Sequence, residues 1–388
     1  MRTNTRAHRC IYGSSLTWCT MNVLKRGLLS PSLMEAVWWR RPSTLPVALL
    51  VMALVIIVAG GTIRINDAGE SCPDWPQCFG TWGFDISVDE QTAYWEEHPD
   101  EIDSRGEDHR YTTFEIFTEW IHRAMAAIIA VPVLLNALLM RAKRGTYGDR
   151  AYHLSVVAGL MLILQATAGA VTVFYDNADW SVALHLSLAC IFSAAFIFQH
   201  MEMRSKEGSK NTIYTLPKAF IAANKRRVNA MVGAIFTLLI LGAWVSSTAG
   251  GQYNQGCSVG FPTGWPKCNG SVLPSFDGPG ALVQMIHRFG ALIVGLVLVA
   301  GSARIRTEAR EHNATPSFGR ITDLTAGFWM LNVMIGGTYI VAAKMDNFPE
   351  WISLLHLVVG VTGFLVATTA LFSMRISEAK SDDFSEEA

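Results

Sequence analysis

Four histidines occupy matching positions in two halves of this chain, and their side chains carry the most informative chemistry. They are His122, His185, His287 and His356. In each half the first follows Glu or Gln by three positions, and the second follows Trp by five. Imidazole is the commonest protein metal ligand and a frequent axial ligand of haem iron. Two such pairs predict a bis-histidine haem site in each half. The alternative is four interfacial imidazoles without a ligand.

The elements that carry these histidines are expected to be membrane-spanning helices. The 388-residue chain is 51% hydrophobic and only 16% charged, whereas soluble domains carry roughly a quarter of charged residues. Eight apolar stretches are long enough to cross a hydrocarbon core, which takes roughly 20 helical residues. Backbone exposed to lipid must be helical, so we predict an all-α integral membrane protein. The expected spans are 44–65, 119–141, 153–175, 181–203, 228–249, 283–304, 321–343 and 351–374.

The placement of lysine and arginine predicts how these helices are oriented. Basic residues gather before the first span, in the even-numbered connections and after the last span. The odd-numbered connections contain few, and the first of them, from Asp67 through Glu115, is acidic. Both termini are therefore expected on the cytoplasmic side of the cell membrane, or on the matrix side of a mitochondrial inner membrane. The net charge of −1 says nothing useful about partners, and no nucleic-acid partner is expected.

Internal repeats show that the chain is a duplication. The matching segments are Gly60-Gly61 with Gly250-Gly251, Trp75–Gly80 with Trp265–Gly270, Gln165–Gly169 with Asn332–Gly336, and Asp176-Asn177 with Asp346-Asn347. Each half has four spans, so both halves enter the membrane from the same side. We predict two tandem four-helix bundles related by a pseudo-two-fold axis along the membrane normal.

This duplication divides the chain into five parts. They are an N-terminal extension (1–43), a first half (44–203), a basic cytoplasmic linker (204–227), a second half (228–374) and a cytoplasmic tail (375–388). The extension is rich in Arg, Ser and Thr and has one acid. It is either a targeting segment or a stretch upstream of a true start at Met21 or Met34.

Each histidine lies just after the outer end of an inward-running span, and therefore one to two turns below the outer surface. Arg123 and Arg288 directly follow a histidine, and Arg64 ends the first span. Guanidinium groups pair with carboxylates, so these arginines are candidates for binding haem propionates. Ordinary anchoring at the membrane interface is the alternative.

Together these residues resemble the haem A synthase family, in its cysteine-containing eight-helix form (bacterial CtaA and mitochondrial COX15 type). The resemblance covers nearly everything after the N-terminal extension. It rests on Gly60-Gly-Thr-Ile-Arg64, the Trp-Pro-x-Cys loop, Glu119-x-x-His122-Arg123, His185, His287-Arg288 and His356. It implies oxidation of the C8 methyl group of haem O to a formyl group, which gives haem A for cytochrome oxidase assembly.

The resemblance also implies a division of labour between the halves. His287 and His356 would bind a resident haem b, and His122 and His185 would bind the substrate haem O. Glu119 in the first half corresponds to Gln284 in the second. A carboxylate one turn from His122 is suited to accept protons or to stabilise positive charge that develops on the substrate methyl group. We expect Glu119 to be catalytic, with a role at the helix start as the alternative.

Four of the seven cysteines fall in outer connections, where the environment is oxidising. Cys72–Cys78 and Cys257–Cys268 are therefore expected to be disulfides, which either staple these loops or, for Cys72–Cys78, take part in turnover. In some members of the family the first pair exchanges with thiol–disulfide carriers. Cys190 is expected to be a small apolar residue within a span.

The partners implied are haem O, the haem O synthase (protohaem farnesyltransferase) that supplies it, an electron acceptor, a thiol–disulfide carrier and membrane lipid. A homo-oligomer is compatible with the sequence. Two other classes of membrane protein would share part of this pattern, an electron-transfer cytochrome and a transporter. A bis-histidine cytochrome b that transfers electrons would stack its haems across the membrane, and a transporter would have broken helices and polar residues near the midplane.

Overall fold

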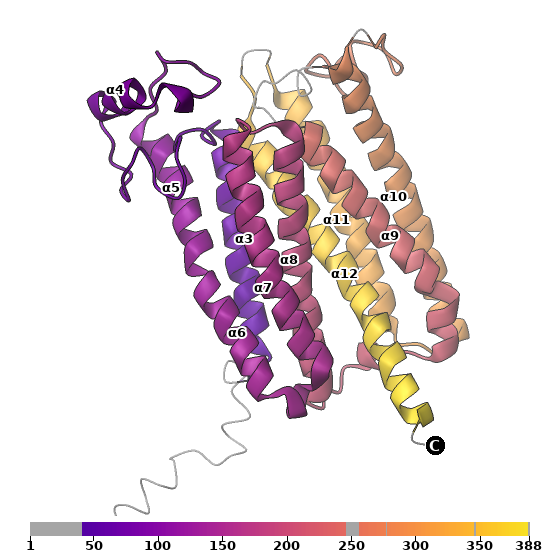
Figure 1. Ribbon diagram of the computed structural model, residues 1–388. Coiled ribbons are helices and arrows are strands. Elements are labelled where there is room, and N and C mark those ends of the chain that lie inside the picture. Colours follow the sequence, from indigo (N-terminus) through magenta and orange to yellow (C-terminus); the bar gives the residue numbers. More distant parts are fainter. Residues whose placement is uncertain (1–40, 246–255, 277, 345–346, 387–388) are drawn as a thin grey trace, which may run out of the picture.

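The computed structural model describes residues 41–245, 256–276, 278–344 and 347–386, and this part of the chain is helical without any named strand. Eight candidate membrane spans lie within it, as predicted (Figure 1). The helices that build these spans are α3 (Thr44–Ile65), α5 (Thr113–Ile128), α6 (Ala130–Ala142), α7 (Arg144–Phe174), α8 (Asp179–Lys206), α9 (Lys218–Val245), α10 (Pro279–Glu311), α11 (Pro316–Ala342) and α12 (Glu350–Glu386). Helices α5 and α6 form one span that is interrupted at Ile129.

The helices extend beyond the spans expected from hydropathy, mainly at the ends where lysine and arginine gather. Helix α8 continues to Lys206 and α9 begins at Lys218, so the connection between the halves is shorter than the expected linker 204–227. Helix α12 likewise continues into the expected tail, to Glu386. Long basic side chains keep their charged ends in water while their stems cover apolar surface, so a helix need not end at the hydrocarbon boundary.

Neighbouring helices form two closed rings. In the first half α3 packs on α5 and α6, α6 on α7, α7 on α8, and α8 on α3; in the second, α9, α10, α11 and α12 close in the same way. The rings meet where α8 contacts α9 and α12, and where α3 contacts α12. Gly61 on α3 makes the last contact close, since a Cβ atom there would lie 2.6 Å from Leu354 of α12. The pseudo-two-fold relation of the halves stays a prediction.

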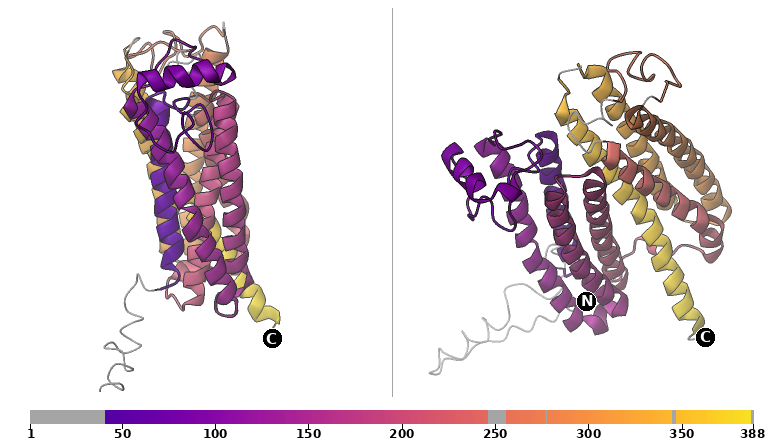
Figure 2. Two further views of the ribbon diagram at one scale, coloured as in Figure 1. Left: turned by 60° about the vertical axis from the view of Figure 1, so that its left-hand side comes forward. Right: turned by 45° about the horizontal axis from the view of Figure 1, so that its top comes forward.

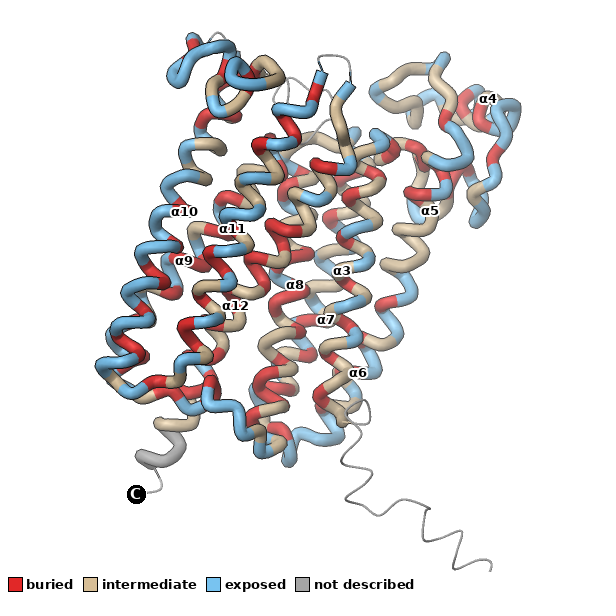
Figure 3. The backbone as a smooth tube through the Cα atoms, turned by 180° about the vertical axis from the view of Figure 1, so that it is seen from behind, coloured by how far each residue is buried: buried red, intermediate tan, exposed pale blue. Residues whose placement is uncertain are grey.

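Burial follows this arrangement. The largest buried apolar cluster runs through the second ring and its junction with α8, and a second cluster joins α3, α6, α7 and α8. Figure 3 shows buried positions concentrated on α8 and α12 between the rings, and exposed positions along the outward side of α10. Exposed leucines and isoleucines on the outward faces, such as Ile163 at 64% and Leu296 at 64%, are what a lipid-facing belt requires.

The acidic first connection folds into a small unit of its own, which the sequence pattern does not predict. It contains helix α4 (Val88–Glu97) and the 3₁₀ turn η2 (Pro99–Glu101), and lies across the ends of the spans (Figure 2). Its core includes Trp95 and Tyr111 packed on the first disulfide. A capping box between Ser87 and Glu90 starts α4.

Candidate functional site

Each of the four histidines lies near the N-terminal end of a helix, and all four of these helices run in the same direction. His122 is on α5, His185 on α8, His287 on α10 and His356 on α12. Each follows its helix start by six to nine residues, which corresponds to roughly 9–14 Å of helical rise. All four therefore lie at one level, close to the end of the molecule that carries α4.

The structure brings the histidines together in two pairs of nearly equal geometry. The ring centroids of His122 and His185 are 6.4 Å apart, with an interplanar angle of 69°. Those of His287 and His356 are 6.5 Å apart, with an angle of 79°. Metal–imidazole bonds are roughly 2 Å long, so two imidazoles on opposite sides of one metal ion have ring centres roughly 6 Å apart. The spacing of both pairs fits one iron between two axial ligands.

A glycine on the neighbouring helix faces every one of the four imidazoles. The pairs are Gly60–His122, Gly169–His185, Gly242–His287 and Gly336–His356. A Cβ atom on these glycines would lie 3.2, 3.1, 3.0 and 2.9 Å, respectively, from the Cε1 atom of the facing histidine. Such distances are too short for an ordinary carbon contact, which is roughly 3.5–4.0 Å. Because these four residues have no side chain, they leave the space that the four imidazole rings occupy.

The ring nitrogens of the four histidines are suitable ligands for haem iron. In the second half Nδ1 of His356 donates to the backbone oxygen of Asn332, at 2.9 Å, which leaves Nε2 as the nitrogen that would face a metal. Nδ1 of His287 is buried and has no hydrogen-bond partner among the described residues. In the first half, the side-chain amide of Gln165 donates to the backbone oxygen of His185, at 3.0 Å. Imidazoles that are half-buried between apolar helices fit an axial ligand of haem.

Arg123 holds the first outer loop in place beside His122. Its Nε donates to Oε1 of Glu119 at 2.9 Å, and its Nη2 donates to the backbone oxygen of Cys72 at 2.9 Å. Its Nη1 donates to the backbone oxygens of Asp74 and Gln77. The side chains of Arg123 and Glu119 are only 12% and 8% exposed. Most of the donors of Arg123 are thus engaged by the protein, and its propionate role stays a prediction.

Arg288 repeats the contacts to loop backbone oxygens in the second half, with two differences. Its Nη1 donates to the backbone oxygens of Gly264 and Lys267, at 2.6 and 2.8 Å. Its Nη2 is buried and has no partner within the described ranges. The residue one turn before His287 is the buried amide Gln284, not a carboxylate. A guanidinium nitrogen with a free donor is what a propionate carboxylate would need.

Arg64 lies at the junction of the two rings, at the outer end of α3. It is within electrostatic reach of three carboxylates, Asp67, Asp179 and Glu350. Asp179 and Glu350 stand at the starts of α8 and α12, where an acid suits the helix dipole. Arg64 is therefore placed between the two halves, and its assignment to a propionate also stays a prediction.

Both expected cysteine pairs are at bonding distance. The sulfur atoms of Cys72 and Cys78 are 2.06 Å apart, and those of Cys257 and Cys268 are 2.02 Å apart. Cys72 and Cys78 are 0% and 1% exposed. Thiol–disulfide exchange needs access to a sulfur, so this burial favours loop stapling over exchange with a carrier. Cys190 is a buried free cysteine within α8.

Two features of the site were not found from the sequence. The first is the set of four glycines that face the histidines: Gly60, Gly169 and Gly336 were recognised only as parts of the repeat. Gly242, which faces His287, was not recognised at all. Gly250-Gly251, the expected match of Gly60-Gly61, lies outside the described residues. The second is the clamp from Arg123 to the backbone of the first loop. Backbone oxygens leave no mark in a sequence.

Fold and site together define a helical membrane protein with two matched pairs of half-buried histidines at one level. The chain belongs to the family of cytochrome oxidase assembly proteins (COX15-CtaA), whose model matches residues 43–368. It is similar to the heme A synthase of Maricaulis maris, 24% identical over 361 residues that cover 85% of this chain and 94% of the relative. It is also similar to the heme A synthases of Lysinibacillus sphaericus (26% identical; 77% and 85% covered) and Geobacillus thermodenitrificans (24%; 79% and 83%).

Proposed function

We propose that this chain is a haem A synthase, an oxidoreductase that converts haem O to haem A in the membrane. The proposal rests on membership of the family, on relatives that carry this name along most of their length, and on two histidine pairs spaced for one iron each. In this reading His122 and His185 hold the iron of the substrate haem O. His287 and His356 hold a resident haem b.

The observation that carries the division between the halves is the difference between Glu119 and Gln284. Both residues are buried one turn from a histidine, at 6% and 4% exposure of the whole residue, but only Glu119 is a carboxylate. Its Oε1 accepts a hydrogen bond from Nε of Arg123 at 2.9 Å, which holds the carboxylate in place one turn from His122. Oxidation of a methyl group to a formyl group releases protons, so a base is needed in the half that holds the substrate.

The chain's own residues then have separate tasks. The histidine pair of the first half fixes the iron of haem O, and Glu119 accepts a proton released beside the substrate methyl group. Arg123 orients Glu119 and ties it to the loop closed by Cys72–Cys78, which covers this end of the site. A haem bound to His287 and His356 would supply one-electron redox chemistry.

Several partners are part of the proposal and are supported less directly. The substrate would come from the haem O synthase, and electrons would leave to an acceptor in or near the membrane. The basic ends of the helices support a cytoplasmic position for both termini, with the chain in the plasma membrane. A homo-oligomer is compatible with the exposed apolar surface. The buried position of Cys72 and Cys78 makes a thiol–disulfide carrier a less favoured partner.

The test is to extract and chromatograph haems from membranes of cells that make haem O, with and without this chain. We expect haem A only where the chain is present, and little haem A with Glu119→Gln. If haem O is unchanged while the purified protein shows a bis-histidine spectrum, the chain is an electron-transfer cytochrome. The common depth of the four histidines argues against that class, because such proteins would stack haems across the membrane.

A further inference from the structure

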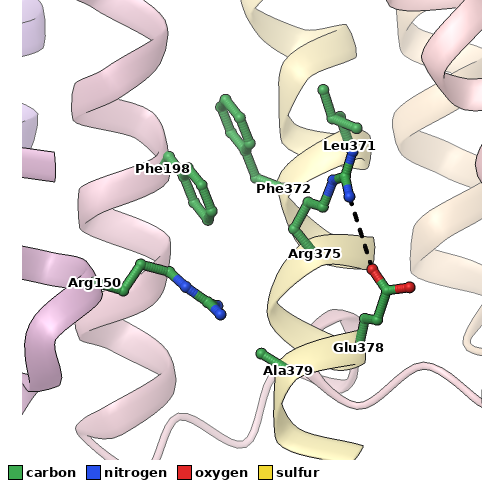
Figure 4. A pocket seen from close by; sticks show the side chains of 7 residues that line it. All are labelled: Arg150, Phe198, Leu371, Phe372, Arg375, Glu378 and Ala379. Atoms are coloured by element: carbon green, nitrogen blue, oxygen red, sulfur yellow. Dashed lines mark ion pairs between the residues drawn. The ribbon is translucent and has the colours of Figure 1, made fainter. Parts of the chain in front are cut away.

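The junction between the two rings contains a second site, at the end of the molecule opposite the histidines. A cavity of about 370 Å³ opens there between α7 and α8 on one side and α12 on the other. Its lining consists of Arg150, Phe198, Leu371, Phe372, Arg375, Glu378 and Ala379. Figure 4 shows Arg150 extending toward α12, Arg375 running along α12, and the rings of Phe198 and Phe372 beside each other between the helices. We refer to this cavity as the junction crevice.

The junction crevice lies where the hydrocarbon core of a membrane would end. Phe198 and Phe372 follow the starts of α8 and α12, at Asp179 and Glu350, by roughly 30 Å of helical rise. This is about the thickness of the hydrocarbon core. The aromatic rings of Phe198 and Phe372 are stacked, with centroids 4.4 Å apart and an interplanar angle of 1°. The crevice thus has an apolar side that faces the core and a charged side one turn further on.

The charged side carries more positive than negative charge. Arg150 reaches its carboxylate, Glu202, only at 3.4 Å, and Arg375 reaches Glu378 only at 3.9 Å. Glu378 is also held by the ammonium group of Lys225, at 2.6 and 2.9 Å. Two carboxylates therefore face three cations. The side chains of Arg150 and Arg375 line the crevice and are 42% and 45% exposed, so a ligand can reach their guanidinium groups.

We propose that the junction crevice binds the phosphate group of an anionic phospholipid, with an acyl chain along Leu371 and the stacked rings. Arginine recognises phosphate oxygens through paired N–H donors. Basic pockets between helices at the cytoplasmic surface are suited to anionic headgroups. Phosphatidylcholine carries a cation that would face the two arginines, whereas phosphatidylglycerol does not. Because the crevice is formed by both halves, a lipid bound there would bridge them.

The experiment is native mass spectrometry of the purified full-length protein with added phosphatidylglycerol or phosphatidylcholine. We expect the protein to retain phosphatidylglycerol preferentially. Arg150→Gln and Arg375→Gln should each weaken this retention about tenfold, and the double variant should retain the two lipids equally. Arg141→Gln is the matched control, since Arg141 is an exposed arginine at the same end of the bundle, on α6.

Two further arms separate a lipid site from its alternatives. Ala379→Trp narrows the crevice and keeps both arginines, so it should also lower retention if the acyl chain contributes. Inorganic phosphate in excess should displace little lipid; full displacement would show an anion site without lipid selectivity and would overturn the proposal. Equal retention of both lipids by the unaltered protein, or unchanged retention in a double variant that keeps its unfolding temperature, would also overturn it.

Discussion

Gly336 on α11 lies so close to His356 on α12 that a Cβ atom on the glycine would be 2.9 Å from the imidazole Cε1. The same relation links Gly242 with His287 at 3.0 Å. Helix packing in membranes uses small residues to bring backbones together. Here the small residue also sets where a ligand ring can lie, because the ring fills the space that a side chain would need.

Gly336→Ala is therefore expected to displace His356 and to release or alter the haem bound in the second half. Alanine favours a helix by roughly 1 kcal/mol over glycine, so a loss of haem would not reflect a weakened helix. Gly327→Ala is the control, because Gly327 is on the same helix and has no neighbour within 4 Å of its Cβ position. The measurement is the absorbance spectrum of the purified protein. Equal spectra for the two variants would refute the role of the glycine.

Glycine-to-alanine substitutions in the first half should impair substrate binding without releasing the resident haem of the second half. Gly60→Ala and Gly169→Ala place a methyl group 3.2 and 3.1 Å from His122 and His185. We expect both variants to keep the haem of the second half and to lose most haem A formation. Gly159→Ala on α7 is the control, since nothing lies within 4 Å of that position. Loss of the purified protein's haem in Gly60→Ala would contradict our assignment of the halves.

Glu119→Gln gives the first half the side chain that the second half has at Gln284. We expect the rate of haem A formation to fall by roughly 10²–10⁴, the range typical of a lost general base, while the resident haem stays bound. The amide can still accept from Arg123, so the loop contacts should survive. Gln284→Glu is the reciprocal control and should leave conversion unchanged. A Glu119→Gln enzyme of normal rate would rule out the catalytic role.

The sequence predicted what depends on side-chain type and period, and missed what depends on backbone geometry. Eight spans follow from hydropathy, and the pairing of His122 with His185 follows from their register near one surface. Helix α4 was missed although Ser87 and Glu90 form a capping box, because a short amphipathic helix in an acidic segment lacks a long apolar face. The loop oxygens bound by Arg123 are backbone atoms, which any residue at those positions would supply.

Glu70 in the first outer connection should make stability fall as pH rises. Burial raises the pKa of Glu70 above its ordinary value of 4.5, and the nearby Asp103 and Asp176 act in the same direction. A raised folded-state pKa means that the folded protein binds the proton more tightly, so the stabilisation is present at low pH and is lost as pH rises through that pKa. Glu70→Gln should remove this part of the pH dependence, measured as Tm in mildly acidic and mildly alkaline buffer.

Glu90 provides a control of opposite sign for that measurement. Hydrogen bonds from Ser87 lower the pKa of Glu90, so its contribution is present at higher pH and is lost as pH falls. Glu90→Gln should therefore change the Tm profile in the acidic range and in the other direction. If Glu70→Gln and the unaltered protein have parallel profiles, the burial of Glu70 does not affect stability.

The two disulfides should affect the sites in different halves of the protein, because each closes a loop that is held by a different arginine. Replacing Cys72 and Cys78 by serine frees the loop that Arg123 clamps, and should lower haem A formation while the resident haem stays bound. Replacing Cys257 and Cys268 frees the loop bound by Arg288 and should weaken haem retention first. Closing loops of this length with a disulfide stabilises the folded protein by roughly 2–3 kcal/mol, so both double variants should also unfold at lower temperature.

The measurement is haem content and haem A yield in parallel. If both variants lower the two quantities in the same ratio, the loops stabilise the whole protein and do not serve separate sites.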